Sequence, residues 1–446
     1  MTTLRPRPPL LAGKSQSSNV DDAFDWDMAM TYYGKIESLD FFGNGILHKD
    51  GKCCFIKNAL PFEEIMYEIT EDKKNYARGE TVEILSPSLQ RLKPPCPYYG
   101  DCGGCDFQHI DYLGEAGAKE QHVARMLAKI GGCVDFVLLP FVRAQRIFAY
   151  RNQVTFHMKE GQTCFYRQAT HDYVAVNRCE LLEEPLNRAV DEINAMRLTE
   201  ATSVFLRGDN TGHVFAAVNN GSAEKAKELL SFSDVITGAA AVNEKGTAVY
   251  GDDTLLFDLD GIKLKTSYKS FFQVNTEMAK SMLLFVKELM GDEKQGVLLD
   301  LYCGVGSIGL YLADHFQKVY GIEIMKDAAA LAAENAEANE IEAEYISGKT
   351  ENRLKNLLEK VPRADVVLLD PPRQGLQKDV AKTVAAYGAE KILYISCDPA
   401  SLSRDLKELT KSYRVLSAKP FDLFPRTAHV ETVCLLSKLN TEHHIE

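Results

Sequence analysis

The C-terminal part of the chain alternates short apolar runs with longer amphipathic segments. Runs such as VLLDL, VYGIE and ILYIS predict buried strands, and the segments between them have apolar residues at helical spacing. The predicted strands are 297–301, 319–323, 344–346, 365–369 and 391–395. The predicted helices are 308–316, 326–339, 351–360, 377–387 and 400–411, followed by a strand pair near 412–418 and 429–437. This alternation is typical of a doubly wound α/β domain, which binds ligands at the carboxyl ends of its strands.

A glycine-rich turn, DLYCGVGSIG, joins the first of these strands to its helix, with glycines at 304, 306 and 309. The backbone N–H groups of such a turn suit a nucleotide-type ligand. Glu323 ends the next strand 19 positions after Gly304, where a carboxylate can hold ribose hydroxyls. The motif therefore predicts an adenosine-containing cofactor, and it leaves NAD and S-adenosylmethionine open.

Chemically distinctive residues follow the later strands of this domain. Cys397 lies between a strand and the helix that Pro399 begins, where oriented N–H groups can stabilise a thiolate nucleophile. The neighbouring Asp398 opposes this effect, and a buried structural cysteine is the alternative. Asp370 precedes two prolines, so we expect its carboxylate to face the cleft. Glu431 lies in an apolar run, where a carboxylate without a partner or a role would be costly to bury.

A thiol, a carboxylate and a cofactor at one sheet edge suggest a specific reaction. Uracil C5 is a poor nucleophile until a thiolate adds to C6 and forms an enolate, which can attack an electrophilic methyl group. A base must then remove the C5 proton so that the thiol can leave. One cysteine and one general base are the minimum equipment for this chemistry.

A second cluster of chemistry lies in the loop PPCPYYGDCGGCDFQH. Cys96, Cys102 and Cys105 fall within ten residues, in a pattern typical of soft-metal ligation. A cubane iron–sulfur cluster needs four thiolates, and Cys179 in VNRCELLEEP is the predicted fourth. The other candidates for the fourth place are Cys53, Cys54, Cys133 and Cys164. Zinc is the alternative occupant, and three unligated cysteines are the remaining alternative.

The remaining segments have weaker signals. Residues 1–31 show no period and are predicted to be mostly disordered, whereas 32–93 contain five short strand-like runs typical of a small OB-type barrel. The barrel's candidate nucleic-acid contacts, which are equally typical of a solvated loop, are Lys73, Lys74, Tyr76 and Arg78. A helix is expected from about 109 to 130, and then a mixed α+β segment to residue 266. Arg151 and Arg207 in that segment could contact phosphate or lie at the surface.

Composition limits the class of protein. The 446 residues are 45% hydrophobic and 26% charged, as in an ordinary globular protein, and no run approaches the roughly 18 apolar residues of a membrane helix. No signal peptide is recognised, so we expect a cytoplasmic protein, in which eleven cysteines favour metal binding or catalysis over disulfides. The net charge of −12 argues weakly against a general nucleic-acid binder, but it permits a local basic groove.

Together, six motifs resemble those of the S-adenosylmethionine-dependent RNA (uracil-5-)-methyltransferases. They are CPYYGDCGGCDFQH, FFQVN, DLYCGVGSIGL, DPPR, SCDP and HVE, and they extend from residue 96 to residue 431. The resemblance implies a C-terminal Rossmann-like methyltransferase domain at 267–446 and an OB-like TRAM barrel at 32–93. Between them it implies a central α+β iron–sulfur domain at 94–266, whose helix 111–132 can pack on the catalytic domain.

The resemblance also assigns roles to residues. It makes Cys397 the nucleophile and Glu431 the base that removes the C5 proton. It places cofactor-binding positions at Gln273, Tyr302, Ser307, Glu323 and Asp370. It places the ligands of a [4Fe-4S] cluster at Cys96, Cys102, Cys105 and Cys179. Relatives often have Asn where Ser307 and Asp398 stand here.

For the substrate, the resemblance favours 23S rRNA, because relatives with both a TRAM domain and a cluster generally modify large-subunit rRNA. The target uridine would have to leave its stack to reach Cys397. The alternatives are the same chemistry on tRNA and a non-enzymatic RNA-binding protein. No membrane association and no protein partner are inferred.

Overall fold

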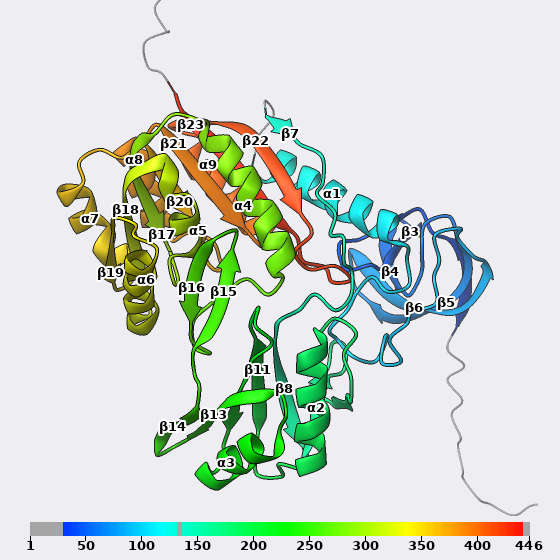
Figure 1. Cartoon of the computed structure of the whole chain (residues 1–446). Coiled ribbons are helices and arrows are strands. Elements are labelled where there is room, and N and C mark those ends of the chain that lie inside the picture. The colour runs from blue at the N-terminus through cyan, green and yellow to red at the C-terminus, as the bar shows by residue number, and fades with distance from the viewer. Residues whose placement is uncertain (1–29, 132–135, 440–446) are drawn as a thin grey trace, which may run out of the picture.

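In the part of the chain that it describes, the computed structural model has three large β-sheets and a separate two-stranded hairpin (Figure 1). It describes residues 30–131 and 136–439. The predicted disordered segment 1–31 therefore lies outside the described residues, except for its last two. Among the described helices, none is both long enough and apolar enough to span a lipid bilayer.

The largest sheet has eight strands in the order β19-β18-β17-β20-β21-β23-β22-β7. Its strands are β17 (Gln295–Leu301), β18 (Phe316–Glu323), β19 (Ala343–Ser347), β20 (Val366–Leu369), β21 (Lys391–Ser396), β22 (Tyr413–Phe421), β23 (Glu431–Lys438) and β7 (Val137–Leu138). β17 to β21 run parallel, and β23 is antiparallel to both of its neighbours. The strand order reverses at β17, between β18 and β20, which is where doubly wound folds bind ligands.

Helices cover both faces of this sheet, so its central strands are apolar on both sides. All four residues of β20 are buried. The helices are α4 (Thr276–Met290), α5 (Ser307–Tyr311), α6 (Lys326–Ala338), α7 (Thr350–Lys360), α8 (Lys378–Tyr387) and α9 (Pro399–Leu409). The predicted α/β alternation is confirmed, with one local error: the helix expected at 308–316 ends at Tyr311. A 3₁₀ turn follows it, and Phe316 already pairs in β18 because its ring is buried in the core.

A seven-stranded sheet forms the lower lobe in Figure 1, in the order β10-β9-β8-β11-β12-β13-β14. Its strands are β8 (Gln153–Lys159), β9 (Gln162–Tyr166), β10 (Tyr173–Ala175), β11 (Ser203–Gly208), β12 (Val214–Asn219), β13 (Ile236–Asn243) and β14 (Gly246–Gly251). The helices α2 (Glu184–Met196) and α3 (Ala223–Phe232) pack on one face of this sheet. The hairpin β15 (Leu255–Leu259) and β16 (Ile262–Thr266) turns at Asp260-Gly261 and connects this sheet to the larger one.

Six strands near the N-terminus close into a small barrel. They are β1 (Thr31–Lys35), β2 (Ser38–Leu39), β3 (Gly45–Lys49), β4 (Lys52–Lys57), β5 (Glu64–Asp72) and β6 (Tyr76–Ser86). β1 pairs with β5 at one edge, and the adjoining β2 pairs with β3 at the other edge. Because one continuous segment supplies both edges, the sheet closes on itself.

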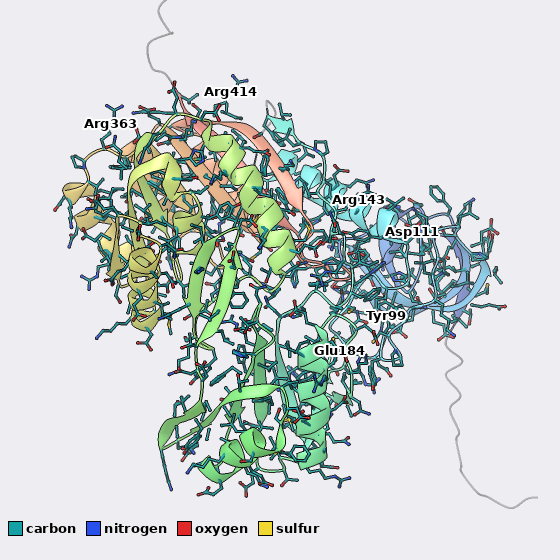
Figure 2. All side chains as sticks on the ribbon, in the orientation of Figure 1. Tyr99, Asp111, Arg143, Glu184, Arg363 and Arg414 are labelled. Atoms are coloured by element: carbon teal, nitrogen blue, oxygen red, sulfur yellow. The ribbon has the colours of Figure 1, made fainter. Side chains whose placement is uncertain are left out.

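Helix α1 (Tyr112–Lys129) connects the barrel to the large sheet. Asp111, labelled in Figure 2, caps its N-terminus by accepting a hydrogen bond from the Gly114 N–H group. Val123 and Leu127 of α1 pack into the same core as Leu402 and Leu406 of α9. The helix thus packs on the large sheet's outer layer, as the resemblance suggested.

Candidate active site

A cavity of about 930 Å³ opens at the carboxyl ends of β17, β18, β20 and β21. The structure brings most of the predicted site residues to its walls. Those lining it are Gln273, Tyr302, Glu323, Asp370, Cys397 and Glu431. Ser307, at the start of α5, is not among the described residues that line this cavity. Phe271 and Phe424 also line the cavity, and the sequence analysis assigned no role to either of them.

The glycine-rich turn shapes one wall of the cavity. Tyr302 has φ 71° and Gly306 has φ 82°, so the chain leaves β17 in left-handed backbone conformations and turns sharply into α5. Gly309 lies close to Asp300, because a Cβ atom there would come within 2.6 Å of the Asp300 Oδ2 atom. The Gly309 N–H group instead donates to that oxygen at 3.1 Å. The glycines therefore hold the turn against the end of the strand.

Glu323 is fixed by two backbone hydrogen bonds at the end of β18. Its Oε2 atom accepts from the Gly304 N–H group at 2.9 Å, and its Oε1 atom accepts from the Met325 N–H group at 2.8 Å. The carboxylate thus faces the cavity directly beside the glycine turn. This is the position that the sequence predicted for a group holding ribose hydroxyls.

Buried carboxyl groups are crowded around the cavity. Burial and the nearby Asp370 raise the pKa of Asp300 to about 8, and burial raises the pKa of Asp370 to about 7. Burial, together with Asp370, also raises the pKa of Glu431 well above its ordinary value, although Arg373 opposes this. Burial is the largest cause of each of these pKa shifts, and the charge of Asp370 adds to the shifts of Asp300 and Glu431.

The Cys397 thiol has a raised pKa, which corrects the prediction that the helix N-terminus would stabilise its thiolate. Burial and the carboxyl groups of Glu431 and Asp370 raise this pKa to about 12, against a smaller opposing effect of Arg373. Asp398 explains part of the difference, because its side chain caps α9 and accepts from the Ser401 N–H group at 2.6 Å. An N–H group of the first turn is therefore used by the cap.

A second cavity, of about 300 Å³, is lined by all four predicted cluster ligands. They are Cys96, Cys102, Cys105 and Cys179. Tyr99 belongs to the same wall and lies where the barrel meets the seven-stranded sheet (Figure 2). Among the described residues, no three His, Cys, Asp or Glu side chains converge tightly enough to hold a single metal ion. The four thiols that line this cavity are a donor set of the soft kind used in soft-metal ligation.

The other cysteines considered as a fourth ligand do not line this cavity among the described residues. Cys164 is buried in β9, and Cys53 and Cys54 lie in the barrel strand β4. Cys133 lies outside the described residues.

The two cavities share a wall at the start of β8. Arg151 and Gln153 line both of them. Arg151, considered as a phosphate contact, therefore lies between the two candidate sites. Arg207, the other candidate, is buried and donates to the Ser267 and Ser270 carbonyl groups, so it is neither a surface charge nor exposed to a phosphate.

The barrel's candidate nucleic-acid contacts are at the β5–β6 turn, and two of them are engaged within the barrel. Lys73 and Arg78 both pair with Glu71, with N–O distances of 3.1 and 3.4 Å. These exposed pairs leave each cation's charge partly neutralised.

Comparisons with known proteins agree with this picture. A model of the tRNA (uracil-5-)-methyltransferase family matches residues 248–439. A protein of Caldanaerobacter subterraneus subsp. tengcongensis described as an RNA methyltransferase is 32% identical, over 91% of this chain and 98% of its own length. One from Bacillus cereus, described in the same words, is 33% identical, over 90% of this chain and 95% of its own length.

The chain belongs to the RNA (uracil-5-)-methyltransferase family. The resemblance seen in its motifs is thereby confirmed, and the protein is an enzyme of that class. The crystal structure of Pyrococcus abyssi tRNA (uracil-54, C5)-methyltransferase with S-adenosyl-L-homocysteine has the same fold, with a TM-score of 0.73. At 23% identity it covers 91% of this chain and 100% of its own.

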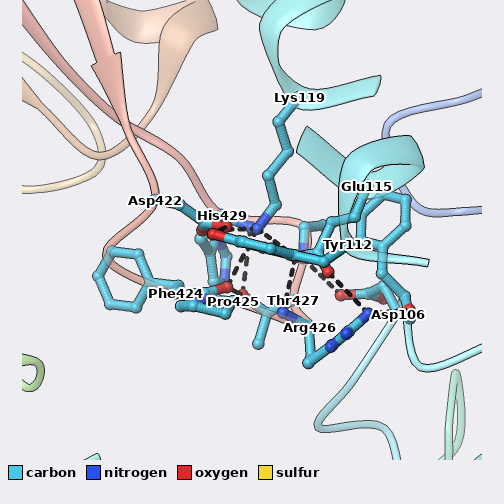
Figure 3. Close-up of polar contacts among 12 residues, drawn as sticks. Asp106, Tyr112, Glu115, Lys119, Asp422, Phe424, Pro425, Arg426, Thr427 and His429 are labelled. Atoms are coloured by element: carbon cyan, nitrogen blue, oxygen red, sulfur yellow. Dashed lines mark hydrogen bonds and ion pairs between the residues drawn. The ribbon is translucent and has the colours of Figure 1, made fainter. Parts of the chain in front are cut away.

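A buried ionic network holds the loop that precedes Glu431 in the methyltransferase (Figure 3). The Lys119 ammonium group on α1 donates to Glu115 Oε1 and Asp422 Oδ1, both at 2.8 Å, and to the Phe424 carbonyl at 3.1 Å. The Lys119, Glu115 and Asp422 side chains are fully buried. Burial opposes the lysine charge, but the two carboxylates outweigh it and raise the pKa of Lys119.

The same network reaches the cysteine loop. Glu115 Oε1 accepts from the Arg426 N–H group at 2.7 Å, and the Arg426 guanidinium donates to the Phe107 and Ile110 carbonyl groups at 3.2 and 3.0 Å. Asp106, next to Cys105, accepts from the Ala428 N–H group at 2.7 Å. The network thus joins the cysteine loop, α1 and the loop that leads to Glu431.

The sequence analysis missed this network. A charged pair at positions i and i+4 of α1, Glu115 and Lys119, on a helix face that also carries buried apolar residues, was the available signal. Its third member, Asp422, is 303 residues from Lys119, and nothing local indicates their contact.

We predict that Lys119→Met destabilises the methyltransferase and lowers its activity. Removing one member of a buried ionic cluster typically costs about 3–5 kcal/mol, because the remaining charges stay buried without a partner. The loop before Glu431 also loses its tie to α1. Thermal unfolding and methyl transfer should be measured beside Lys129→Met, an exposed lysine on the same helix. Equal behaviour of the two variants would contradict the prediction.

Proposed function

We propose that this methyltransferase transfers a methyl group from S-adenosylmethionine to C5 of a uridine in RNA, with Cys397 as nucleophile and Glu431 as general base. One observation carries the proposal: Cys397 and Glu431 line the same cavity as Glu323, Tyr302 and Gln273. A nucleophile, a base and a nucleoside-binding carboxylate thus share about 930 Å³. Membership of the RNA (uracil-5-)-methyltransferase family supports the choice of substrate.

The lining of the cavity suits S-adenosylmethionine. A sulfonium cation would be attracted by the carboxyl groups of Asp370 and Glu431, which line the cavity. Glu323 would receive the ribose hydroxyls, with Tyr302, Gln273 and Asp370 completing the walls. Ser307 lies at the start of α5, so we assign it to the turn beneath the cofactor. When bound, the cofactor supplies the electrophilic methyl group.

Two residues of the chain, Cys397 and Glu431, carry out the other steps of the proposed reaction. The Cys397 thiol gives up its proton to solvent, and the resulting thiolate forms a bond to uracil C6. The C5–C6 double-bond electrons move into an enolate, whose C5 is the nucleophile. After C5 has gained the methyl group, the Glu431 carboxylate takes the C5 proton, the C6–S bond breaks and the thiolate leaves. The raised pKa of Glu431 makes its carboxylate a stronger base for this step. The raised pKa of Cys397 keeps the thiol protonated at neutral pH before substrates bind.

For the four-cysteine cavity we propose a [4Fe-4S] cluster held by Cys96, Cys102, Cys105 and Cys179. Four thiols are the number of protein ligands that a cubane cluster needs, and thiolates are the soft ligands that bind iron–sulfur clusters. The proposed reaction requires no electron transfer, so the cluster's role is to hold the cysteine loop against the seven-stranded sheet. Accordingly we assign the central domain to 94–266, between a TRAM barrel at 32–93 and the catalytic domain at 267–446.

The favoured target is a uridine of 23S rRNA, supported by the combination of a closed barrel and a four-cysteine site. The tRNA alternative has support of its own. A solved tRNA (uracil-54, C5)-methyltransferase shares the fold over 91% of this chain, so these additional lobes do not by themselves distinguish rRNA from tRNA substrates.

We predict that Cys397→Ala abolishes both methyl transfer and covalent RNA attachment. Glu431→Gln should slow turnover by about 10²–10⁴-fold, the usual contribution of a general base, and should accumulate a denaturation-resistant protein–RNA adduct. Cys434→Ala, a buried cysteine of the same sheet, is the matched control and should retain both activities. Methyl transfer by the Cys397→Ala protein would refute the covalent mechanism.

We predict that deleting the gene removes 5-methyluridine from 23S rRNA and leaves tRNA unchanged. Mapping 5-methyluridine by mass spectrometry in both RNAs, with and without re-expression of the gene, checks this. Loss confined to tRNA would overturn the rRNA target, and loss from neither would overturn the proposed activity.

We predict that protein purified without oxygen contains iron near four atoms per chain, by the cubane stoichiometry. Cys179→Ser should lower the iron content, whereas Cys164→Ser, which alters a buried cysteine of β9 outside the cavity, should retain it. Iron analysis and the visible absorption spectrum give the result. Stoichiometric zinc in the wild-type protein would contradict the cluster.

A further inference from the structure

We propose that the open end of the seven-stranded sheet is a stacking platform for unpaired bases of the RNA that flank the target uridine. The proposal rests on the RNA substrate proposed above and adds a binding site outside the catalytic cavity. The platform consists of His157 on β8, Tyr166 on β9 and Tyr173 on β10, with His171 beside them.

The strand register places the three rings on one face. His157 pairs with Cys164, and Tyr166 pairs with Tyr173, so these side chains point to the same side of the sheet. Helices α2 and α3 cover the opposite face, where Phe156 and Phe165 pack into the core.

The neighbouring half of this face is already occupied. Phe205 and Phe215, on β11 and β12, pack into the core that includes the large sheet. Among the described residues, nothing comparable covers the end formed by β8, β9 and β10, where Tyr166 and Tyr173 remain 37% and 42% exposed. The sheet thus has helices on one face and exposed aromatic rings on part of the other, an arrangement that RNA-binding sheets use to stack bases.

The rings form a continuous aromatic surface. The centroids of Tyr166 and Tyr173 are 5.3 Å apart with an interplanar angle of 27°, and His157 lies 4.2 Å from Tyr166. His171 meets Tyr166 edge-on at 5.5 Å. Packing among themselves does not bury the two tyrosines, so apolar ring surface remains for a ligand. Every base offers a π-face, and unpaired bases are therefore the occupant that matches this chemistry.

The platform lies on the same sheet face as one wall residue of the catalytic cavity. Gln153 begins β8, lines the cavity and lies on the same face as His157, four residues further along. At about 3.3 Å per residue this separation is about 13 Å along the strand. An RNA whose uridine has left its stack to reach Cys397 exposes its neighbouring bases. Those neighbours would then pass over β8 and onto the tyrosines.

The test measures RNA binding apart from catalysis. The probes are a fluorescently labelled single-stranded oligoadenylate and a labelled RNA duplex, titrated with the full-length protein. Tyr166→Ala and Tyr173→Ala should each raise the Kd for the single strand on the order of tenfold, the loss of one stacked base. The Kd for the duplex should not change, because its bases are already stacked.

Two further variants separate stacking from structural damage. Tyr166→Phe keeps the ring and should bind as the wild type does. Phe232→Ala removes an exposed aromatic side chain from α3, on the covered side of the sheet, and should have no effect. For methyl transfer to bulk RNA from a deletion strain, the tyrosine-to-alanine variants should raise KM and leave kcat within about twofold.

Each result has a separate meaning. Unchanged single-strand Kd values in both alanine variants overturn the platform, even if the wild type makes 5-methyluridine. Equal weakening of single strand and duplex also overturns it, because stacking of unpaired bases predicts a difference. A wild-type protein that forms no 5-methyluridine overturns the proposed function instead, and the oligoadenylate measurement still decides whether the platform exists.

Discussion

The arrangement of the active site depends on the ion pairs that the buried Lys119 ammonium group makes with Glu115 and Asp422. This ammonium group lies between the carboxylates of Glu115 and Asp422, in a place where no uncompensated charge could remain. Through Glu115 the same cluster holds Arg426, and through Asp106 it adjoins Cys105. Three segments far apart in the chain therefore share one polar centre. The loop that ends at Glu431 is held from the side that also carries the cysteine cavity.

The same contacts link the cysteine loop to the loop that precedes Glu431. The cysteine loop contacts β9 of the seven-stranded sheet, where the Gly103 N–H group donates to the Tyr166 carbonyl at 3.0 Å. Arg151 and Gln153 line both cavities. A group that fills the smaller cavity would stiffen a wall of the larger one.

Local sequence patterns predicted most strands and helices of the large-sheet domain. They failed where long-range packing determines the structure. The four apolar residues of β20 suit a place covered on both faces, so this strand was recognisable. The helix after the glycine turn was predicted too long, because the buried position of Phe316 is a property of the assembled core. Cys397 was placed correctly at a strand end, but its pKa was predicted in the wrong direction. The carboxyl groups of Asp370 and Glu431 raise the pKa of Cys397, and both residues are distant from Cys397 in the sequence.

The sequence by itself determined the order of strands and helices, the glycine turn and the residues able to carry the chemistry, because these depend on neighbouring residues and on the reactivity of single side chains. Only the tertiary structure decided which of those residues share a cavity, that four cysteines from two segments line another, and that Lys119 meets Asp422 across 303 positions. Burial and electrostatic coupling act through space. They arise only when the chain brings charged groups together away from water.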